Sequence, residues 1–109
     1  MPLEKTINQI SEFVSERDWS QFHNSKDLAL ALSIEAAELN ELFLWKSTEG
    51  ADPTKLKEEL ADIFIYALLL AEKHKLNIED IILEKLQKNS DKYPINRAKG
   101  KSDKYTELI

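Results

Sequence analysis

Cysteine is absent from the sequence, and glycine and proline are scarce, with two and three copies among 109 residues. Without cysteine, the chain can form neither disulfides nor thiolate metal sites. Few glycines and prolines favour long helices, because these residues most often interrupt them. The longest apolar run, residues 63–71, is nine residues long, whereas a membrane-spanning helix needs about 20. We therefore expect no membrane partner.

Positive charge is also limited, since 15 Lys and Arg face 20 Asp and Glu, which gives a formal net charge of −5. This balance argues against binding to nucleic acid or to anionic lipid. The N-terminal residues lack the basic and then apolar pattern of a signal peptide, so we expect a cytoplasmic protein. An acidic protein that handles a polyanion needs a cation between the two.

Hydrophobic residues make up 42% of the chain and recur at helical spacing, which predicts an all-α fold. Helix starts are indicated by Asn24 or Ser25, by Asp52 followed by proline, and by Asn77. The chain reads as one domain, 1–109, with four helices and a polar tail that is either flexible or laid over a partner. The helices are expected at about 2–17, 26–46, 53–75 and 78–92, and the tail at 95–109.

The second expected helix carries two acids on its apolar side. Glu35 and Glu38 share one stripe with Leu42 and Trp45, whereas Ser33 lies on the opposite side. A buried, ionised carboxylate without a partner lowers the free energy of unfolding by roughly several kcal/mol, unless it takes up a proton. Two acids one turn apart also repel each other. Something positive must therefore compensate them.

The third expected helix repeats the pattern with Glu59 and Asp62, which share a stripe with Tyr66. If the two helices pack as an antiparallel hairpin, four acids converge without matching basic residues. All-oxygen ligands favour Mg²⁺ or Mn²⁺ over Zn²⁺. A di-iron bundle is disfavoured, because neither His23 nor His74 follows a glutamate by three residues.

A less specific interpretation stays open at this point. A Glu-x-x-Glu pair is most often a solvated helix face, and Glu41 and Glu58 are expected to be such residues. The chain would then be a non-catalytic helical module that oligomerises or binds divalent ions.

The acid pairs resemble a known signature. Residues 35–39 followed by 58–62 resemble the MazG family of all-α NTP pyrophosphohydrolases, which has Glu-x-x-Glu followed by Glu-x-x-Asp. Residues 17–23, 41–46, 85–94 and 104–108 resemble the dCTP pyrophosphatase subgroup of that family. The likeness thus extends over nearly the whole chain.

The resemblance implies a four-helix bundle that oligomerises through its helices. It implies a Mg²⁺-dependent enzyme that converts a (d)NTP to the monophosphate and pyrophosphate, with a preference for dCTP-like deoxynucleotides, and serves to cleanse nucleotide pools. It implies that metal is bound by Glu35, Glu38, Glu59 and Asp62. It further implies that substrate is surrounded by Trp19, His23, Trp45, Tyr66 and Asn89, with Lys85, Lys92 and Tyr93 facing the phosphates or a neighbouring subunit.

Several of these residues have a structural alternative. Trp19 and Trp45 are either plates that stack on a nucleobase or core tryptophans. His23 either hydrogen-bonds the base or caps the second helix. His74 is expected to stabilise a helix terminus rather than to bind a ligand. Tyr66, one turn after the last acid, is expected to contact the sugar.

The catalytic roles are expected to fall on Glu38, Glu35 and Lys85. Either acid can be a metal ligand or a general base, with Glu38 favoured as the base. Lys85 is expected to stabilise developing negative charge, unless it is an ordinary solvated lysine. The run 63–71 leaves the third helix apolar almost all round, so it must be enclosed on every side. We therefore expect a homo-oligomer, a dimer of dimers, with sites near subunit interfaces.

Overall fold

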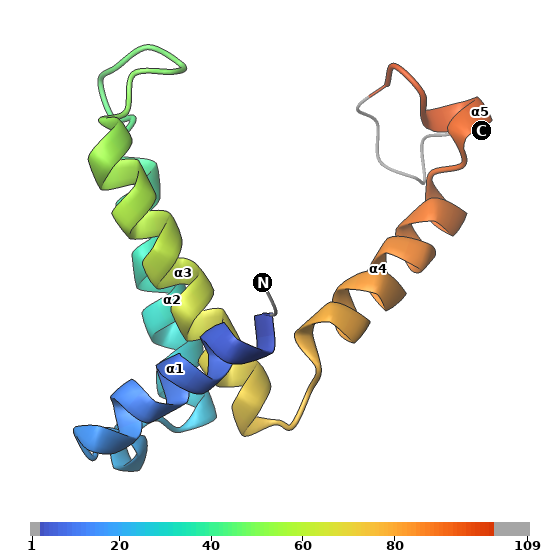
Figure 1. Ribbon diagram of the computed structural model, residues 1–109. Coiled ribbons are helices and arrows are strands. Elements are labelled where there is room, and N and C mark those ends of the chain that lie inside the picture. Colours follow the sequence, from blue (N-terminus) through green and yellow to red (C-terminus); the bar gives the residue numbers. More distant parts are fainter. Residues whose placement is uncertain (1–2, 102–109) are drawn as a thin grey trace. The chain divides into compact units, whose positions relative to one another are not determined.

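The computed structural model describes residues 3–101, and these residues form helices and turns without any strand. The all-α class predicted from periodicity is confirmed. The elements in chain order are α1 (Leu3–Glu16), the short 3-10 helix η1 (Ser20–Phe22), α2 (Ser25–Glu41), α3 (Pro53–Lys73), α4 (Ile78–Lys92) and α5 (Ile95–Ala98) (Figure 1).

The chain divides into two compact units between Lys75 and Leu76. In the first unit, α2 and α3 pack side by side as an antiparallel hairpin, and α1 crosses α3 near the end where α2 begins (Figure 1). The second unit contains α4 and α5. In residues 3–101, no helix has the length and apolarity that a membrane crossing requires.

Three helices begin at side-chain caps that the sequence predicted. The Asn24 side chain accepts a hydrogen bond from the backbone N–H of Asp27 at 2.8 Å. Asp52 accepts one from the N–H of Thr54 at 2.9 Å, with proline following at the first helical position. Asn77 caps α4 in the same way. Each cap satisfies an N–H group that the helix itself leaves unpaired.

The second helix ends earlier than predicted, at Glu41 rather than near Lys46. The N–H groups of residues 42–44 bond to carbonyls three residues back instead of four, so the helix tightens into turns. Trp45, after these turns, adopts φ 63°, a left-handed conformation that a right-handed helix does not contain. Beyond it, a side chain at Gly50 would come within 2.8 Å of the Lys46 Cβ, so the turn requires glycine there.

The first and third helices are also slightly shorter than expected, ending at Glu16 and Lys73. Asp18 (φ 53°) and Lys75 (φ 56°) are in the left-handed region just beyond these ends. His74 is the C-terminal cap of α3, and its Nε2 is hydrogen-bonded to the Ser25 Oγ at 2.9 Å. This contact joins the start of α2 to the end of α3, in keeping with the terminus role predicted for His74.

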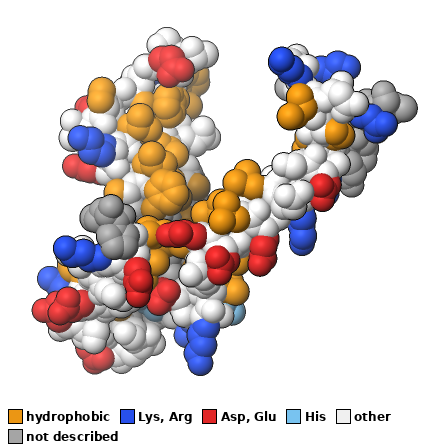
Figure 2. Space-filling model, turned by 45° about the vertical axis from the view of Figure 1, so that its right-hand side comes forward, with side chains coloured by type: hydrophobic (Ala, Val, Ile, Leu, Met, Phe, Trp, Pro, Cys, Tyr) orange, Lys and Arg blue, Asp and Glu red, His pale blue; other side chains and the backbone are white. Residues whose placement is uncertain are grey.

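The buried core of the described chain lies at this same end of the hairpin. It consists of Val14, Leu28, Leu68 and Ala71, which come from α1, α2 and α3. Many other large apolar side chains are exposed, and hydrophobic side chains reach the surface along the hairpin (Figure 2). Among those on α2 and α3 are Leu30, Ile34, Leu60 and Phe64.

The tail prediction is tested only in part. Residues 95–98 form α5, so the tail begins as a short helix rather than as irregular chain. Residues 1–2 and 102–109, including the segment 104–108 that carried part of the resemblance, lie outside the described residues.

Candidate metal centre and nucleotide pocket

The α2–α3 hairpin brings three of the four predicted acids together. Glu35 and Glu38 come from α2 and Glu59 from α3, and one carboxylate oxygen of each lies within 4.8 Å of the others. Antiparallel packing explains this, because it sets the middle of α2 against the first half of α3. Asp62 is not in the cluster and lines the adjoining pocket one turn further along α3. Its role as a ligand stays a prediction.

The acids differ in how far they are enclosed. Glu35 and Glu59 are half-buried, whereas Glu38 and Asp62 are exposed. The expectation that both acids of α2 would sit on a buried face is therefore wrong for Glu38 in the single chain. The cluster is reachable from solvent through Glu38, while its inner oxygens are shielded.

The shielded oxygens lack donors as long as the acids are ionised. The Oε2 atoms of Glu35 and Glu59 are buried without a hydrogen-bond partner among residues 3–101. A proton on Glu35 supplies a donor, so the hydrogen bond with Glu59 is the main cause that raises the pKa of Glu35 to about 7. Desolvation and the neighbouring charge of Glu38 raise it further. The site thus takes up a proton near neutral pH or holds another cation.

The donor set fits a hard divalent cation. Carboxylate oxygens are the ligands that Mg²⁺ and Mn²⁺ prefer, and buried oxygens without donors are satisfied when a cation lies between them. No basic side chain of residues 3–101 donates a hydrogen bond to the inner oxygens of Glu35 and Glu59. Glu35 and Glu59 would hold the metal through their inner oxygens, with Glu38 beside them in the cluster and Asp62 one helical turn from Glu59.

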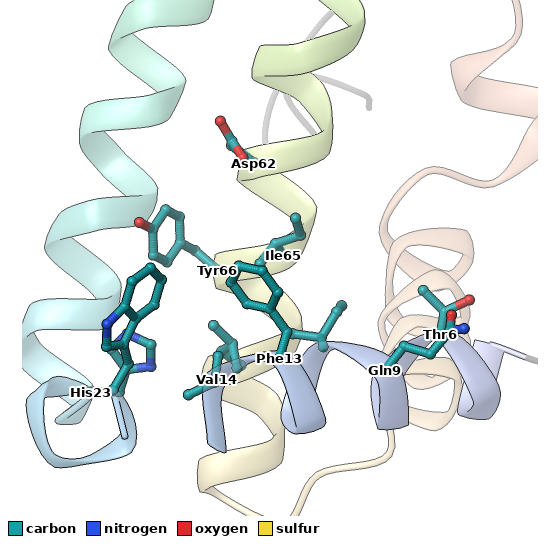
Figure 3. A pocket seen from close by; sticks show the side chains of 11 residues that line it. Thr6, Gln9, Phe13, Val14, His23, Asp62, Ile65 and Tyr66 are labelled. Carbon is teal, nitrogen blue, oxygen red and sulfur yellow. The ribbon is translucent and has the colours of Figure 1, made fainter. Parts of the chain in front are cut away.

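Next to the acids, a pocket of about 440 Å³ opens between α1, α3 and the connection that contains η1. Asp62 and Tyr66 extend from the same side of α3, and Phe13 and Val14 extend from α1 (Figure 3). The pocket has the mostly apolar wall and few polar groups typical of small-molecule sites. The lining residues are Thr6, Gln9, Ile10, Phe13, Val14, Trp19, His23, Asp62, Ile65, Tyr66 and Leu69.

An aromatic contact holds one wall of this pocket in place. The rings of Phe13 and Trp19 meet edge to face, with centroids 5.7 Å apart and an angle of 77°. The Arg17 guanidinium lies 3.7 Å from the Phe13 ring centre and donates to the Phe13 carbonyl at 3.1 Å. Trp19 is thereby a fixed flat surface with 44% of its area exposed, not a core tryptophan.

The two predicted tryptophans are not brought together. Trp19 lines the pocket, whereas Trp45 is 94% exposed at the loop end of the hairpin. Trp45 is not a core residue, and in its own chain it does not contribute to the pocket wall. Its contact with a substrate stays a prediction.

The remaining predicted site residues are His23 and those of α4 and its C-terminal cap. His23 lines the pocket, while the cap of α2 is Asn24, so the capping alternative for His23 is wrong. Lys85, Asn89 and Lys92 lie on α4, and Tyr93 is its C-terminal cap. They belong to the second unit, and their part in a site stays a prediction.

Sequence reasoning missed the contribution of α1 to the pocket. Ile10 and Phe13 recur at helical spacing in the first helix, a pattern that does not distinguish a pocket residue from a core residue. One signal pointed to Phe13: it lies one helical turn before Arg17, beside the aromatic connector. Helical periodicity indicates which side of a helix is apolar, but it does not indicate which other element packs against that side.

Comparisons with known proteins agree with this geometry. Residues 30–108 match the MazG-like family. The chain is 41% identical to dCTP pyrophosphatase 1 of Bos taurus and 42% identical to dCTP pyrophosphatase 1 of Homo sapiens. Each match covers 90% of this chain, but only 63% and 62% of the length of the bovine and human proteins. A crystal structure of a pyrophosphatase from Archaeoglobus fulgidus superposes with TM-score 0.80 at 33% identity, covering 84% of this chain and 92% of that one. The resemblance based on the acid pairs is confirmed, and this chain belongs to the MazG-like family.

Proposed function

We propose that the chain is a metal-dependent nucleoside triphosphate pyrophosphohydrolase, which converts a (d)NTP and water to the monophosphate and pyrophosphate. The observation that carries the proposal is the adjacency of a three-carboxylate cluster to a pocket with aromatic walls. The cluster suits a triphosphate with its cation, and the pocket suits a nucleoside. Asp62 belongs to the pocket wall one turn from Glu59, so the two parts adjoin.

The metal is proposed to be Mg²⁺, with Mn²⁺ as a substitute. A bound metal ion would neutralise negative charge on the triphosphate and make a coordinated water more acidic. Glu35, Glu59 and Asp62 are proposed to hold it. Glu38 is the most exposed of the clustered acids, which suits a group that accepts a proton from the attacking water.

The substrate is proposed to be dCTP or a related deoxynucleotide. Trp19 offers a flat face for a base, and His23 offers a ring nitrogen for a hydrogen bond. Tyr66 lies between the acids and the aromatic wall, where the sugar of a nucleotide would fall. Packing of its ring against C2′ would disfavour a ribonucleotide hydroxyl. The proteins named dCTP pyrophosphatase 1 support the choice of base.

The α4 residues are proposed to serve the phosphate end. Lys85 and Lys92 carry the positive charge that the acid cluster lacks, and Lys85 is our candidate for stabilising charge on the leaving group. Asn89 and Tyr93 are proposed to contact the substrate. A cytoplasmic location and a role in cleansing nucleotide pools remain predictions.

The chain is also proposed to form a homo-oligomer, a dimer of dimers that packs through its helices. Four side chains form the whole buried core of residues 3–101, and large apolar residues remain exposed on α2 and α3. Exposed apolar surface of this extent is typical of subunit interfaces. Light scattering at micromolar concentration tests it, and a monomer would contradict it.

A substrate panel tests the activity. The purified chain is incubated with Mg²⁺ and each of the common NTPs and dNTPs, and pyrophosphate and orthophosphate are measured separately. Pyrophosphate with dCTP as the best substrate is expected. Orthophosphate alone indicates a phosphatase, and no product from any nucleotide favours the helical ion-binding or oligomerisation module.

Metal binding is tested without turnover. Titration of the chain with Mg²⁺ or Mn²⁺ in a calorimeter should show binding that is lost in Glu59→Gln. Glu58→Gln is the matched control, because Glu58 is the neighbouring exposed acid outside the cluster. Equal binding by both variants would contradict the proposed site.

A further inference from the structure

The further inference concerns Arg17, and it rests on the proposed function. Arg17 is exposed, directly follows the last residue of α1 and does not line the pocket. Its side chain nevertheless contacts the pocket residue Phe13 in two ways, through the ring and through the backbone carbonyl. Two contacts to one residue restrict a side chain that samples many rotamers in water. The pocket wall therefore has a support that lies outside the pocket.

The backbone at Trp19 is placed without the Arg17 side chain. The Trp19 N–H bonds to the Val14 carbonyl at 3.1 Å. The Gln21 side chain donates to the Asp18 carbonyl at 3.0 Å and to the Asp18 carboxylate at 3.1 Å, which fixes the turn before Trp19. Because none of these bonds uses the guanidinium, truncation of Arg17 should leave the turn in place.

The orientation of the Trp19 ring depends instead on Phe13. The two rings are 5.7 Å apart at 77°, an edge-to-face arrangement in which the positive edge of one ring lies against the negative face of the other. Phe13 is itself 47% exposed, so the core of the first unit covers only part of it. The Arg17 guanidinium lies over the Phe13 ring, 3.7 Å from its centre. Arg17 thus restricts the rotation of Phe13, and Phe13 restricts the rotation of Trp19.

We propose that Arg17 is a positioning residue for the nucleoside: by holding Phe13, it keeps the Trp19 ring in the orientation that receives the base. A base that binds to a freely rotating ring must order that ring at a cost in conformational entropy, whereas a ring held beforehand avoids the cost. Arg17 therefore contributes to substrate affinity without touching the substrate. It takes no part in the step at phosphorus, which the proposed function assigns to the acids.

Steady-state kinetics of Arg17→Ala test this role. KM for the best dNTP should rise roughly 3- to 10-fold, the usual affinity cost of ordering one side chain on binding. The value of kcat should stay close to that of the wild type, because the acids are unchanged. Arg17→Lys should lie between the two, since lysine keeps the charge and a donor but lacks the planar group that covers the ring.

Lys5→Ala is the matched control for the loss of one positive charge. Lys5 is an exposed cation of α1 that does not line the pocket, so its removal should leave KM unchanged. An equal rise of KM in Lys5→Ala and Arg17→Ala would assign the effect to net charge and would overturn the proposal.

Fluorescence measures the Trp19 ring directly. The chain has two tryptophans, so Trp19 is the only one in a Trp45→Phe background. In that background, Arg17→Ala should raise the quenching of Trp19 by acrylamide and lower its fluorescence anisotropy. The far-UV circular dichroism should not change, because the backbone bonds around Trp19 remain. A general loosening of the fold would change the circular dichroism as well.

A double-mutant cycle shows whether Arg17 acts through Phe13. In a Phe13→Leu background the ring is absent, so Arg17→Ala should raise KM little further. Fully additive increases would show that Arg17 reaches the substrate by another route, such as direct contact with the triphosphate. That result would overturn the proposal.

Three further results would overturn it: an unchanged KM in Arg17→Ala, a raised KM with unchanged quenching of Trp19, or an Arg17→Ala chain that does not fold. Pyrophosphate release by the wild type together with an unchanged KM in Arg17→Ala removes this inference alone. A wild-type chain that releases no pyrophosphate from any nucleotide removes the proposed function and this inference with it, so the two failures are distinguished.

Discussion

The two ends of the α2–α3 hairpin differ in how they are packed. At the end crossed by α1, Val14, Leu28, Leu68 and Ala71 are buried, and the Ser25–His74 hydrogen bond ties the helices together. At the loop end, Leu44 and Trp45 are 56% and 94% exposed. The acid cluster lies between the two ends.

This difference shows which packing contacts a single chain forms by itself and which apolar side chains it leaves exposed. Packing at the α1 end uses residues of the first unit alone, so it defines the pocket. The loop end presents apolar side chains without burying them, which a lone chain tolerates only at a cost in free energy. Stability of the single chain should therefore depend on the α1 end, and assembly on the loop end.

The largest effect on activity is expected from the acid cluster, which is not part of the apolar packing at either end of the hairpin. Glu38→Gln should lower kcat roughly 100- to 10,000-fold, the usual range for a lost general acid–base group. The fold should persist because Glu38 is exposed. Circular dichroism and a pyrophosphate assay measure both properties. Full activity in this variant would remove Glu38 from the site.

The packing contrast is tested by Leu28→Ala and Leu44→Ala. Leu28 is 2% exposed, so its truncation should lower the free energy of unfolding by about 2–5 kcal/mol. Leu44 is 56% exposed, and its truncation should change the chain's own stability by less than about 0.5 kcal/mol. Denaturant titrations at several protein concentrations compare them. A loss in Leu44→Ala that is present at high protein concentration and disappears on dilution would locate its contacts between copies.

The pocket wall is tested with Tyr66. Tyr66→Ala should raise KM roughly 10- to 100-fold through loss of a stacking or packing contact with the nucleoside. Tyr66→Phe keeps the ring and should retain most of the affinity. Steady-state kinetics with a deoxynucleotide and its ribonucleotide counterpart measure both effects, and an unchanged KM in Tyr66→Ala would place the nucleoside elsewhere.

A smaller effect is expected from pH. The ordinary pKa of a glutamate, 4.5, applies to Glu35 in the unfolded chain, and in the folded chain its pKa is about 7, mainly through the hydrogen bond with Glu59. The folded state thus binds more protons between these values, so metal-free stability should fall as pH rises from about 4.5 to 7. Thermal melts with chelator test this, and Glu35→Gln should flatten the slope. A metal-free melting temperature that rises over this range would contradict the assignment.

The smallest effect is expected at the contact between Ser25 and His74. Their hydrogen bond is solvent-accessible, so Ser25→Ala should cost no more than about 1 kcal/mol. A double-mutant cycle with His74→Ala isolates the pair from other effects of each change. A coupling energy of zero would show that the α1 end is held by its apolar core alone.

Local signals in the sequence predicted most of the fold. The caps at Asn24, Asp52 and Asn77 were visible because a capping side chain bonds to a backbone group only two or three residues away. The end of α2 was misplaced by five residues because the apolar pattern continues through residues 42–46. The structure has turns at residues 42–44 and a left-handed conformation at Trp45, and no glycine or proline in this segment indicates them.

The sequence by itself determined the helical class, the hairpin and the acid pairs, because helical periodicity and capping depend on neighbours a few residues apart. Only the tertiary structure decided that Glu38 stays exposed, that Phe13 supports Trp19, and that Trp19 and Trp45 lie at opposite ends. The reason is physical: one helical face can be covered by any other element. Which element covers it depends on the packing of segments far apart in the chain.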